Sequence, residues 1–254
     1  MVIENKSYPL VSVIIPNFNN SNSIVEAVHS VLRGTYKNVE ILIYDDASTD
    51  ESVVQLKALE LNHPEVTVTY SDINKGAGYA RNALLEKAKG DILAFLDADD
   101  IWKANKLERQ VQLLLDLNLD IVTCAYDIVD QNSGNRIGHR TPIKNLTYFK
   151  MLLTNWLPMS MTIVRSNLDN AKTMPTIRSR QDYAYWLNIF RSNNNISYGV
   201  VNETLGTYNR SGASLSSSKI KNLKNNYLMF RHNFGYIGSI FFTICNILVR
   251  VLRS

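Results

Sequence analysis

The fold of this chain is decided at residues 94–102, which read Ala94-Phe95-Leu96-Asp97-Ala98-Asp99-Asp100-Ile101-Trp102. An apolar run from Ile92 to Leu96 leads directly into three carboxylates. A short apolar run of this kind is typical of a buried strand, so the acids would follow its C-terminal end. In an open α/β sheet, ligands bind at that end of the strands.

The three acids allow two interpretations. Alternation along an extended chain would aim Asp97 and Asp99 in one direction, with Ala98 turned away. Two converging carboxylates repel each other unless a cation joins them, and Mg²⁺ or Mn²⁺ is commonly held by carboxylates together with substrate phosphates. The alternative is a solvated acidic turn in which Asp100 or Asn105 caps the next helix. The spacing fits both.

Composition is typical of a folded protein, with 45% hydrophobic and 20% charged residues in a chain of 254. This length can bury a substantial core. Cys124 and Cys245 lie at no spacing typical of a metal or disulfide site, which fits a reducing, cytosolic location. Glu4 and Lys6 interrupt the apolar start, so we expect no signal peptide.

The net charge of +4 is concentrated at the C-terminus. Six of the 27 basic residues and none of the 23 acids lie from Lys219 onward, which leaves 21 basic and 23 acidic residues in 1–218. The main domain therefore does not present a general nucleic-acid surface. The basic tail favours contact with an anionic membrane face.

Strand and helix patterns alternate through the first hundred residues. Strands are expected at 11–15, 41–44, 66–70 and 92–96, and helices at 23–33, 48–62 and 79–88. Pro16 is expected to stop the first strand. Ser23 with Glu26 and Ser48 with Glu51 form capping-box patterns at two helix starts. Together these features predict an α/β fold with a doubly wound, mainly parallel sheet flanked by helices.

After Trp102 the pattern loosens. Helices are expected at 105–118 and 183–191, strands at 121–129, 161–165, 196–201 and 205–208, and a turn at 132–135. There is no clear linker, which indicates one domain followed by a C-terminal helical tail.

Two other strand ends carry residues that would meet the acids in one crevice. Asp45 and Asp46 could accept hydrogen bonds from a base or ribose there, or complement the N-terminus of the next helix. Gly76-x-Gly78 would let a ligand approach the backbone, but it lacks the third glycine of a dinucleotide fingerprint. Arg81 either reaches a phosphate nearby or is a solvated surface arginine.

Five separated motifs now occur in order. They are Pro16-x-Phe18-Asn19, Asp45-Asp46-Ala47-Ser48-Thr49-Asp50, Asn74-x-Gly76, Ala80-Arg81-Asn82 and Phe95-Leu96-Asp97-Ala98-Asp99-Asp100. On these motifs the chain resembles family 2 glycosyltransferases over roughly residues 10–215, and its ending resembles bacterial surface-polysaccharide enzymes of the teichuronic acid or O-antigen type. The resemblance implies a GT-A fold, a nucleotide-sugar donor and inversion of the anomeric centre.

The resemblance also implies roles on the donor side. Pro16 and Asn19 would shape the nucleotide pocket, Asp45 or Asp46 would contact the uracil, and Gly76 would lie in the loop beside them.

The same resemblance implies a divalent metal, Mn²⁺ or Mg²⁺. Asp99 would ligate it where it bridges the donor diphosphate, and Asp97 would contact the ribose or a metal-bound water. Arg81 would help to hold the nucleotide. Asp100 is then a structural residue of the turn.

The family's glutamate-aspartate pair, before a helix containing tryptophan, matches Gln181-Asp182 with Trp186. Asp182 is thus the implied catalytic base, which takes the proton from the acceptor hydroxyl. From the residues alone, the favoured interpretation of Asp182 is the N-cap of that helix. Gln181 departs from the commoner glutamate, so its own role is open.

Three further positions bear on the match. Phe18 stands where tyrosine is frequent and can still stack on a base, and Ala47 replaces the usual glycine, which we expect to be a mild change. The loop at 208–216 is similar to one that closes over the donor, and Arg210 could meet a phosphate there.

Residues from Phe230 to Val251 form one apolar stripe at spacings of four and three, which predicts a continuous amphipathic helix. The uncharged span Asn233–Val249 is short for a membrane crossing. With basic residues at its ends, it predicts an interfacial helix on the cytoplasmic face. The alternative is a helix docked on the protein itself or on a second subunit in a homodimer.

The sequence therefore predicts an inverting, metal-dependent hexosyltransferase that uses a nucleotide sugar, UDP-linked, and a glycan or lipid-linked acceptor of bacterial cell-surface polysaccharide. We expect a catalytic domain at 1–218, with a nucleotide-binding half (1–102) and an acceptor-binding half (103–218), and a basic tail at 219–254. The expected location is cytoplasmic, peripheral on the inner membrane face. The alternatives are a sugar-nucleotide-forming nucleotidyltransferase and an inert nucleotide-binding subunit of an assembly complex.

Overall fold

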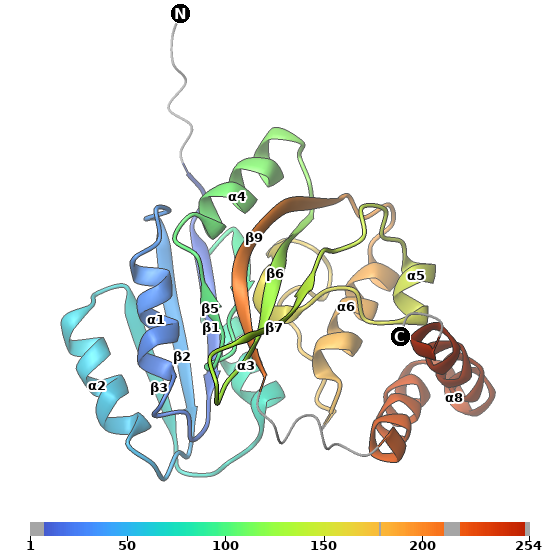
Figure 1. Cartoon of the computed structure of the whole chain (residues 1–254), viewed down its shortest axis with the longest axis horizontal. Coiled ribbons are helices and arrows are strands. Elements are labelled where there is room, and N and C mark those ends of the chain that lie inside the picture. The colour runs from blue at the N-terminus through green and yellow to red at the C-terminus, as the bar shows by residue number, and fades with distance from the viewer. Residues whose placement is uncertain (1–7, 178, 211–218, 252–254) are drawn as a thin grey trace, which may run out of the picture.

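The computed structural model describes residues 8–177, 179–210 and 219–251. Within them, nine strands form a single sheet with helices on both faces (Figure 1). The strand order is β3-β2-β1-β4-β8-β6-β9-β5, and β7 pairs with β6 beside this path.

The first half alternates strand and helix as predicted. It contains β1 (Val11–Asn17), α1 (Ile24–Leu32), β2 (Val39–Asp46), α2 (Ser52–Asn62), β3 (Val66–Ser71), α3 (Ala77–Leu85) and β4 (Ile92–Phe95). These four strands are parallel, with β1 between β2 and β4. Pro16 does not stop β1, because the pairing with β4 ends at Ile14 and leaves Pro16 a strand neighbour on one side only, where a missing N–H is tolerated.

The second half adds strands of both directions. It contains β5 (Ile101–Trp102), α4 (Lys106–Asp116), β6 (Ile121–Asp130), β7 (Arg136–Arg140), α5 (Tyr148–Leu153), the 3₁₀ turn η1 (Met159–Met161), β8 (Thr162–Arg165), α6 (Gln181–Ser192) and β9 (Tyr198–Arg210). β8 is antiparallel to β4 and β6, whereas β6 and β9 are parallel. β9 is one strand where two were expected, and β7 has no counterpart among the expected strands. The sheet is mixed and mostly parallel.

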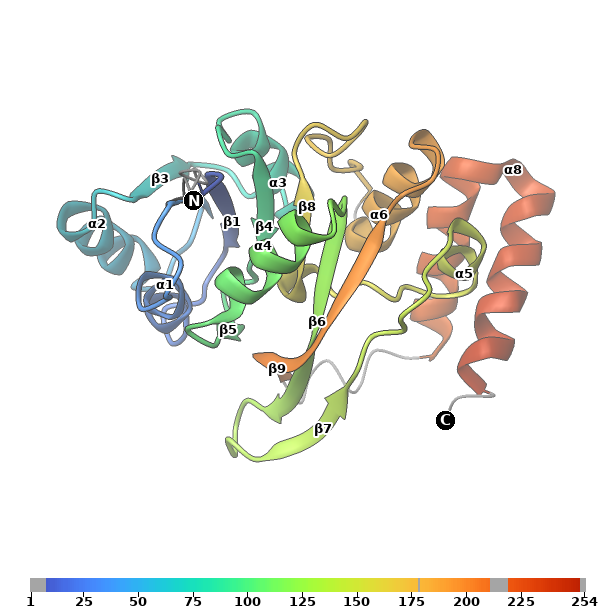
Figure 2. The same cartoon turned by 90° about the horizontal axis from the view of Figure 1, so that it is seen from above.

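Side-chain alternation along the central strands builds two apolar cores. Val13 and Ile15 of β1 face the core covered by α1, α2 and α4. Ile14 faces the other core, which α3, α5, α6 and α8 cover (Figure 2). That second core is rich in aromatic side chains from α6, among them Tyr185 and Trp186, which stack against each other and against Phe95 of β4. Both faces of the sheet are thus buried, as a parallel sheet requires.

Neither capping box forms. Ser23 precedes α1 without a side-chain bond to that helix, and α2 begins at Ser52, after Glu51. The Ser48 hydroxyl instead accepts a hydrogen bond from the backbone N–H of Asn19 at 2.9 Å. A contact between the loops after β1 and β2 therefore uses the hydroxyl that the local pattern assigned to a helix cap.

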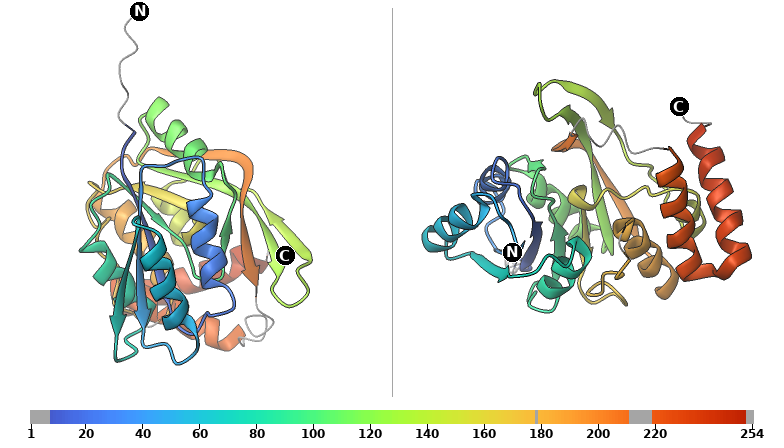
Figure 3. Two further views of the ribbon diagram at one scale, coloured as in Figure 1. Left: turned by 90° about the vertical axis from the view of Figure 1, so that its left-hand side faces the viewer. Right: turned by 90° about the horizontal axis from the view of Figure 1, so that it is seen from below.

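The tail is not one continuous helix. α8 (Lys219–Val251) turns back at Gly235, where φ is 66° and ψ is −166°, a conformation that glycine adopts at little cost. The two arms lie side by side (Figure 3). The predicted single stripe is therefore wrong: Phe230 is buried in the second core, whereas Ile237 is 83% exposed.

Gly90 provides a test of how closely the segment between α3 and β4 approaches β1. A Cβ at Gly90 would lie 2.6 Å from the backbone nitrogen of Ser12 and 2.8 Å from the carbonyl oxygen of Leu10. Since neither backbone atom can rotate away, we expect Gly90→Ala to lower the free energy of unfolding by about 1–3 kcal/mol.

Urea denaturation measures this change. Gly138→Ala is the control, because its Cβ would meet only the Ile128 side chain at an ordinary 3.4 Å. Equal midpoints for Gly90→Ala and the wild type would contradict the close approach.

Candidate active site

The loops that follow β1, β2 and β4 meet α3 at one edge of the sheet. They enclose a first cavity of about 330 Å³. Its walls include Pro16, Phe18, Asp46, Arg81, Asp97 and Asp99. The carboxyl ends of the parallel strands thus bring motifs that are far apart in sequence into one crevice, as the sequence predicts.

The acidic stretch is a turn and not an extended chain. The backbone N–H of Asp100 donates to the carbonyl of Asp97 at 3.0 Å. The alternation argument is therefore wrong, although Asp97 and Asp99 do both line the first cavity. Ser160 of η1 fixes the turn at two points: its hydroxyl accepts from the N–H of Asp97 at 3.0 Å, and its carbonyl accepts from Trp102 Nε1 at 2.6 Å.

Burial and neighbouring charge raise the pKa of Asp99 and of Asp100. Burial, followed by the charge of Asp97, raises the pKa of Asp99 to about 6. Burial and both neighbouring charges raise the pKa of Asp100 well above its usual range. Burial and the same acids raise the pKa of Tyr208, on the cavity wall, to about 12. The crevice therefore has a negative potential that a bound cation would relieve.

The donor set fits a hard divalent cation that substrate phosphates help to hold. Asp97 and Asp99 supply two carboxylates, and no group of three or more acidic, histidine or cysteine side chains in the described ranges could hold a metal by itself. Mg²⁺-type sites commonly consist of one or two carboxylates completed by phosphate and water oxygens.

Asp100 has the structural role that was expected of it. It is fully buried, and its Oδ1 accepts from the backbone N–H of Asn209 at 3.0 Å. The Asn209 side chain also donates to the carbonyl of Asp99. Asn209 therefore joins the acidic turn to the end of β9.

Arg81 is not a solvated surface residue. It lies on α3, is 7% exposed, and its Nη2 lies 2.5 Å from Asp97 Oδ1. Its Nε is buried and has no hydrogen-bond partner in the part of the chain that the structure describes. A guanidinium in the cavity wall is suited to an anionic ligand.

Asn19 and Asp45 hold the crevice loops together. Asn17 Nδ2 donates to Asp45 Oδ2 at 2.8 Å, and the N–H of Ser48 donates to Asp45 Oδ1 at 3.0 Å. Asn19 accepts at its side-chain oxygen from the N–H of Thr49 at 2.8 Å. Both residues are thus engaged between the loops after β1 and β2.

Asp46 lines the cavity and also orders the loop before α3. Its two oxygens accept from the backbone N–H groups of Lys75 and Gly76, at 2.8 and 2.7 Å. Gly76 has a φ of 89°, which favours glycine. Ala47, directly after Asp46, has a φ of 64°. The left-handed backbone at Ala47 explains why glycine is usual at this position of the motif.

A second cavity, of about 500 Å³, lies on the other side of the acidic turn. Asp182, Asn155 and Trp156 line it. Asp182 is the second residue of α6 and not its N-cap, a position that Arg180 holds with a φ of 64°. Asn155 Nδ2 donates to Asp182 Oδ2 at 2.8 Å and so fixes the orientation of the carboxylate.

Gln181 has a packing role. Its side chain fills the space beside Gly78, where a Cβ would lie 2.8 Å from its amide nitrogen. The same nitrogen donates to the carbonyl of Ile177 at 2.7 Å. Gly78 therefore accommodates Gln181 and not a ligand, which corrects the expectation for the second glycine of the Gly76-x-Gly78 pair.

The two cavities share Arg81, Asp97 and Tyr208 in their walls. A molecule in the first cavity and one in the second would meet at this common wall, between the acidic turn and Asp182. The arrangement suits a transfer reaction, in which a charged leaving group is held on one side and a proton is removed on the other.

Sequence reasoning missed several residues of the site. These are Ser160, Asn155 and Asn209. Each makes hydrogen bonds to a segment far away in sequence, and a local sequence pattern does not predict such contacts. Arg210, by contrast, lines neither cavity and ends β9 opposite Asp130. Most of the loop expected at 208–216 lies outside the described residues.

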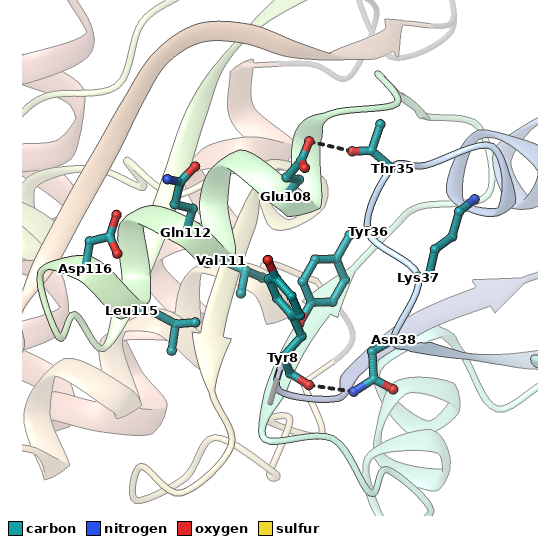
Figure 4. Close-up of a pocket in the computed structure, with 10 residues that line it drawn as sticks. All are labelled: Tyr8, Thr35, Tyr36, Lys37, Asn38, Glu108, Val111, Gln112, Leu115 and Asp116. Carbon is teal, nitrogen blue, oxygen red and sulfur yellow. Dashed lines mark hydrogen bonds between the residues drawn. The ribbon is translucent and has the colours of Figure 1, made fainter. Parts of the chain in front are cut away.

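A third and larger cavity, of about 670 Å³, lies apart from this site (Figure 4). It is formed by α4 and by segments before β1 and β2, at the opposite end of the strands. Thr35 donates to Glu108 at 2.8 Å and Asn38 donates to the carbonyl of Tyr8 at 2.7 Å, so these polar groups join neighbouring segments.

Comparison with known proteins gives a consistent result. Residues 12–174 match the model of the family described as glycosyl transferase family 2. The chain is 35% identical over 220 residues to the Escherichia coli protein WfgD, described as UDP-Glc:alpha-D-GlcNAc-diphosphoundecaprenol beta-1,3-glucosyltransferase, with coverage of 86% of this chain and 84% of WfgD. It is 34% identical to TuaG of Bacillus subtilis, described as a putative teichuronic acid biosynthesis glycosyltransferase, with 88% of each chain covered.

Solved structures share the fold. TarS 1-349 of S. aureus in complex with UDP-GlcNAc superposes with a TM-score of 0.70 at 21% identity, over 86% of this chain and 65% of that one. The mannosyltransferase PcManGT of Pyrobaculum calidifontis, in complex with GDP-Man and Mn²⁺, gives 0.67 at 17% identity, over 96% and 74%.

Ala47 yields a prediction about the crevice loops. A non-glycine residue in the left-handed region costs about 1–2 kcal/mol, while glycine loses somewhat more chain entropy on folding. We therefore expect Ala47→Gly to raise the free energy of unfolding by about 0.5–1 kcal/mol. Gly76→Ala, at a positive φ with open space around it, should change stability in the opposite direction. Thermal unfolding of both variants measures the pair, and a less stable Ala47→Gly protein would refute the argument.

Proposed function

This chain belongs to glycosyltransferase family 2, and on that basis we propose that it transfers a hexose from a UDP-sugar to a lipid-linked glycan, with inversion at the anomeric carbon. That it is a glycosyltransferase with the GT-A fold follows from the family match and the shared fold. The proposal of an inverting transfer from a UDP-sugar rests on one observation, which is that the two cavities share a wall. The acidic turn lines the first cavity, and Asp182 lines the second.

The first cavity is proposed to take the nucleotide. Phe18, 44% exposed on its wall, offers a face on which a base can stack, next to Pro16. Asp46 rather than Asp45 is the candidate for the uracil contact, because only Asp46 lines this cavity. Arg81, which lines the cavity with its guanidinium beside Asp97, would hold a phosphate. The UDP complexes of TarS and the UDP-Glc donor in the description of WfgD support the choice of uridine.

Asp99 and Asp97 would hold Mn²⁺ or Mg²⁺. When bound, such an ion neutralises the charge that develops on a departing nucleoside diphosphate. The raised pKa of Asp99 and the negative crevice support this assignment, as does the Mn²⁺ in the PcManGT complex.

Asp182 is proposed as the base. Its carboxylate would take the proton from the acceptor hydroxyl as that oxygen attacks the anomeric carbon and the bond to the leaving phosphate breaks. Asn155 would position the carboxylate through its hydrogen bond to Oδ2. Residues 1–218 would form the catalytic domain, with the acceptor bound largely by 103–218.

The proposed acceptor is a diphosphate-linked lipid saccharide of bacterial cell-surface polysaccharide, by analogy with the acceptor in the description of WfgD. Because a lipid-linked acceptor is held in a membrane, we also propose a peripheral location, on the cytoplasmic face.

Nucleotide and metal binding can be tested by thermal unfolding. We expect UDP with Mn²⁺ to raise the free energy of unfolding by about 2.7 kcal/mol at a hundredfold excess over Kd, and EDTA to abolish the effect. Asp99→Asn should lose the stabilisation that depends on Mn²⁺, whereas the exposed Asp72→Asn should keep it. Equal stabilisation by GDP or dTDP would refute the choice of UDP.

The base can be tested by transfer kinetics. We expect Asp182→Asn to lower kcat by about 10²–10⁴-fold while stabilisation by UDP and Mn²⁺ stays unchanged, because general-base catalysis contributes that much to the chemical step. Asn155→Ala should lower kcat less, since the carboxylate remains. Asp169→Asn, on the exposed surface, is the matched control. Near-normal transfer by Asp182→Asn would assign the base elsewhere.

A further inference from the structure

The C-terminal hairpin has an inverted polarity. We define the tail hairpin as residues 219–251, in which two helical arms meet at Gly235. In a hairpin that faces only water, apolar side chains pack inside and polar ones lie outside. The second arm of the tail hairpin has the opposite arrangement.

The inner side of the second arm carries three polar side chains beside one aromatic residue, Phe242, which packs against Phe230 and Phe234. Ser239, Thr243 and Asn246 are all buried. Asn226 of the first arm donates from Nδ2 to Asn246 Oδ1 at 2.9 Å, and Asn246 Nδ2 donates to the carbonyl of Leu153 at 2.8 Å. These bonds join the two arms to each other and to α5.

The outer side of the second arm is apolar. Its exposed side chains are Tyr236, Ile237, Ile240, Phe241, Ile244, Ile247 and Leu248, which we call the outer face. No charged residue lies between Asn233 and Val249. A contiguous apolar face of this kind marks an interaction surface.

We propose that the outer face of the tail hairpin inserts into the acyl layer of an anionic membrane leaflet. The charge pattern selects lipid as the occupant: residues 219–254 contain six basic residues and no acid, and Lys224 and Arg231 of the first arm are exposed. Basic groups beside an uncharged apolar face match anionic headgroups above acyl chains.

The geometry limits the depth of insertion. An arm from 236 to 251 is about 24 Å long at 1.5 Å per residue, less than the roughly 30 Å of a bilayer's hydrocarbon core. Consistently, no helix in the described chain is long and apolar enough to span a membrane. The hairpin therefore enters one leaflet and does not cross. Polar groups paired inside an apolar exterior are also what a lipid environment demands.

The hairpin lies beside α5 and α6 (Figure 2). It contacts α5 through Asn246, and Asn155, two residues after the end of α5 at Leu153, holds Asp182. Phe230 of the first arm stacks edge-on against Tyr183, the neighbour of Asp182. If the acceptor is lipid-linked, as the proposed function has it, insertion here places the second cavity beside the membrane that carries the acceptor.

Flotation with vesicles tests the proposal on the full chain. Wild-type protein is mixed with vesicles of phosphatidylcholine and phosphatidylglycerol at three to one, and the double variant Ile237→Lys/Ile244→Lys is compared with it. Both side chains are more than half exposed, so the fold should be kept. We expect the double variant to bind at least tenfold more weakly. Leu61→Lys on α2, at an equally exposed position (85% against 83% for Ile237), should float like the wild type.

Depth is measured with Phe241→Trp, a substitution at an exposed position of the outer face. Quenching of the added tryptophan by lipids brominated on the acyl chain, and weaker binding to vesicles of phosphatidylcholine alone, are the expected results. Flotation of the double variant equal to the wild type would overturn the proposal. So would a wild-type dimer in light scattering without lipid that the double variant converts to a monomer, since the outer face would then bind a second copy.

These outcomes are independent of the proposed function. Flotation requires no donor or acceptor, so a protein that floats but transfers no sugar would refute the proposed reaction and leave the membrane surface standing.

Discussion

Mutual repulsion among Asp97, Asp99 and Asp100 is the constraint around which the site is built. Three carboxylates in one short turn at the end of a buried strand are unfavourable unless each is compensated. Arg81 neutralises Asp97, the backbone of Asn209 hydrogen-bonds Asp100, and Asp99 faces a cavity with a raised pKa. The compensating groups come from α3 and β9. The acidic turn therefore connects α3, in the first half of the chain, with β9, in the second half. Asp99 is the carboxylate that stays suited to binding a cation.

The same turn separates the two cavities. Arg81 and Asp97 belong to both walls, so the proposed charge stabilisation and the proposed proton removal would take place in one crevice. Asp182 is held from the other direction, by Asn155 after α5. Because α5 in turn contacts the tail hairpin, Asp182 and the apolar outer face are both held by contacts with the α5 region.

Local patterns predicted the first half well because β1 to β4 are joined by short connections and are buried on both faces. Their apolar runs, and the polar residues after them, are properties of neighbouring positions. The errors there have tertiary causes: Ser48 bonds Asn19 instead of capping a helix, and Pro16 stays in β1 because β4 ends early. The tail failed for a related reason, since a single residue, Gly235, folds one periodic stripe into two arms.

By itself the sequence determined the parallel half-sheet, the crevice at its carboxyl edge and the family, since all three depend on residue types at fixed spacing along the chain. The tertiary structure decided what each acid contacts, how Asn155 and Ser160 hold Asp182 and the acidic turn, and which side of the tail is polar. Those features join segments tens of residues apart, and their partners are selected by packing rather than by any local pattern. Residues 94–102 show both contributions. Their sequence pattern predicted a buried strand followed by acids, whereas only the fold assigned Asp97, Asp99 and Asp100 their separate environments.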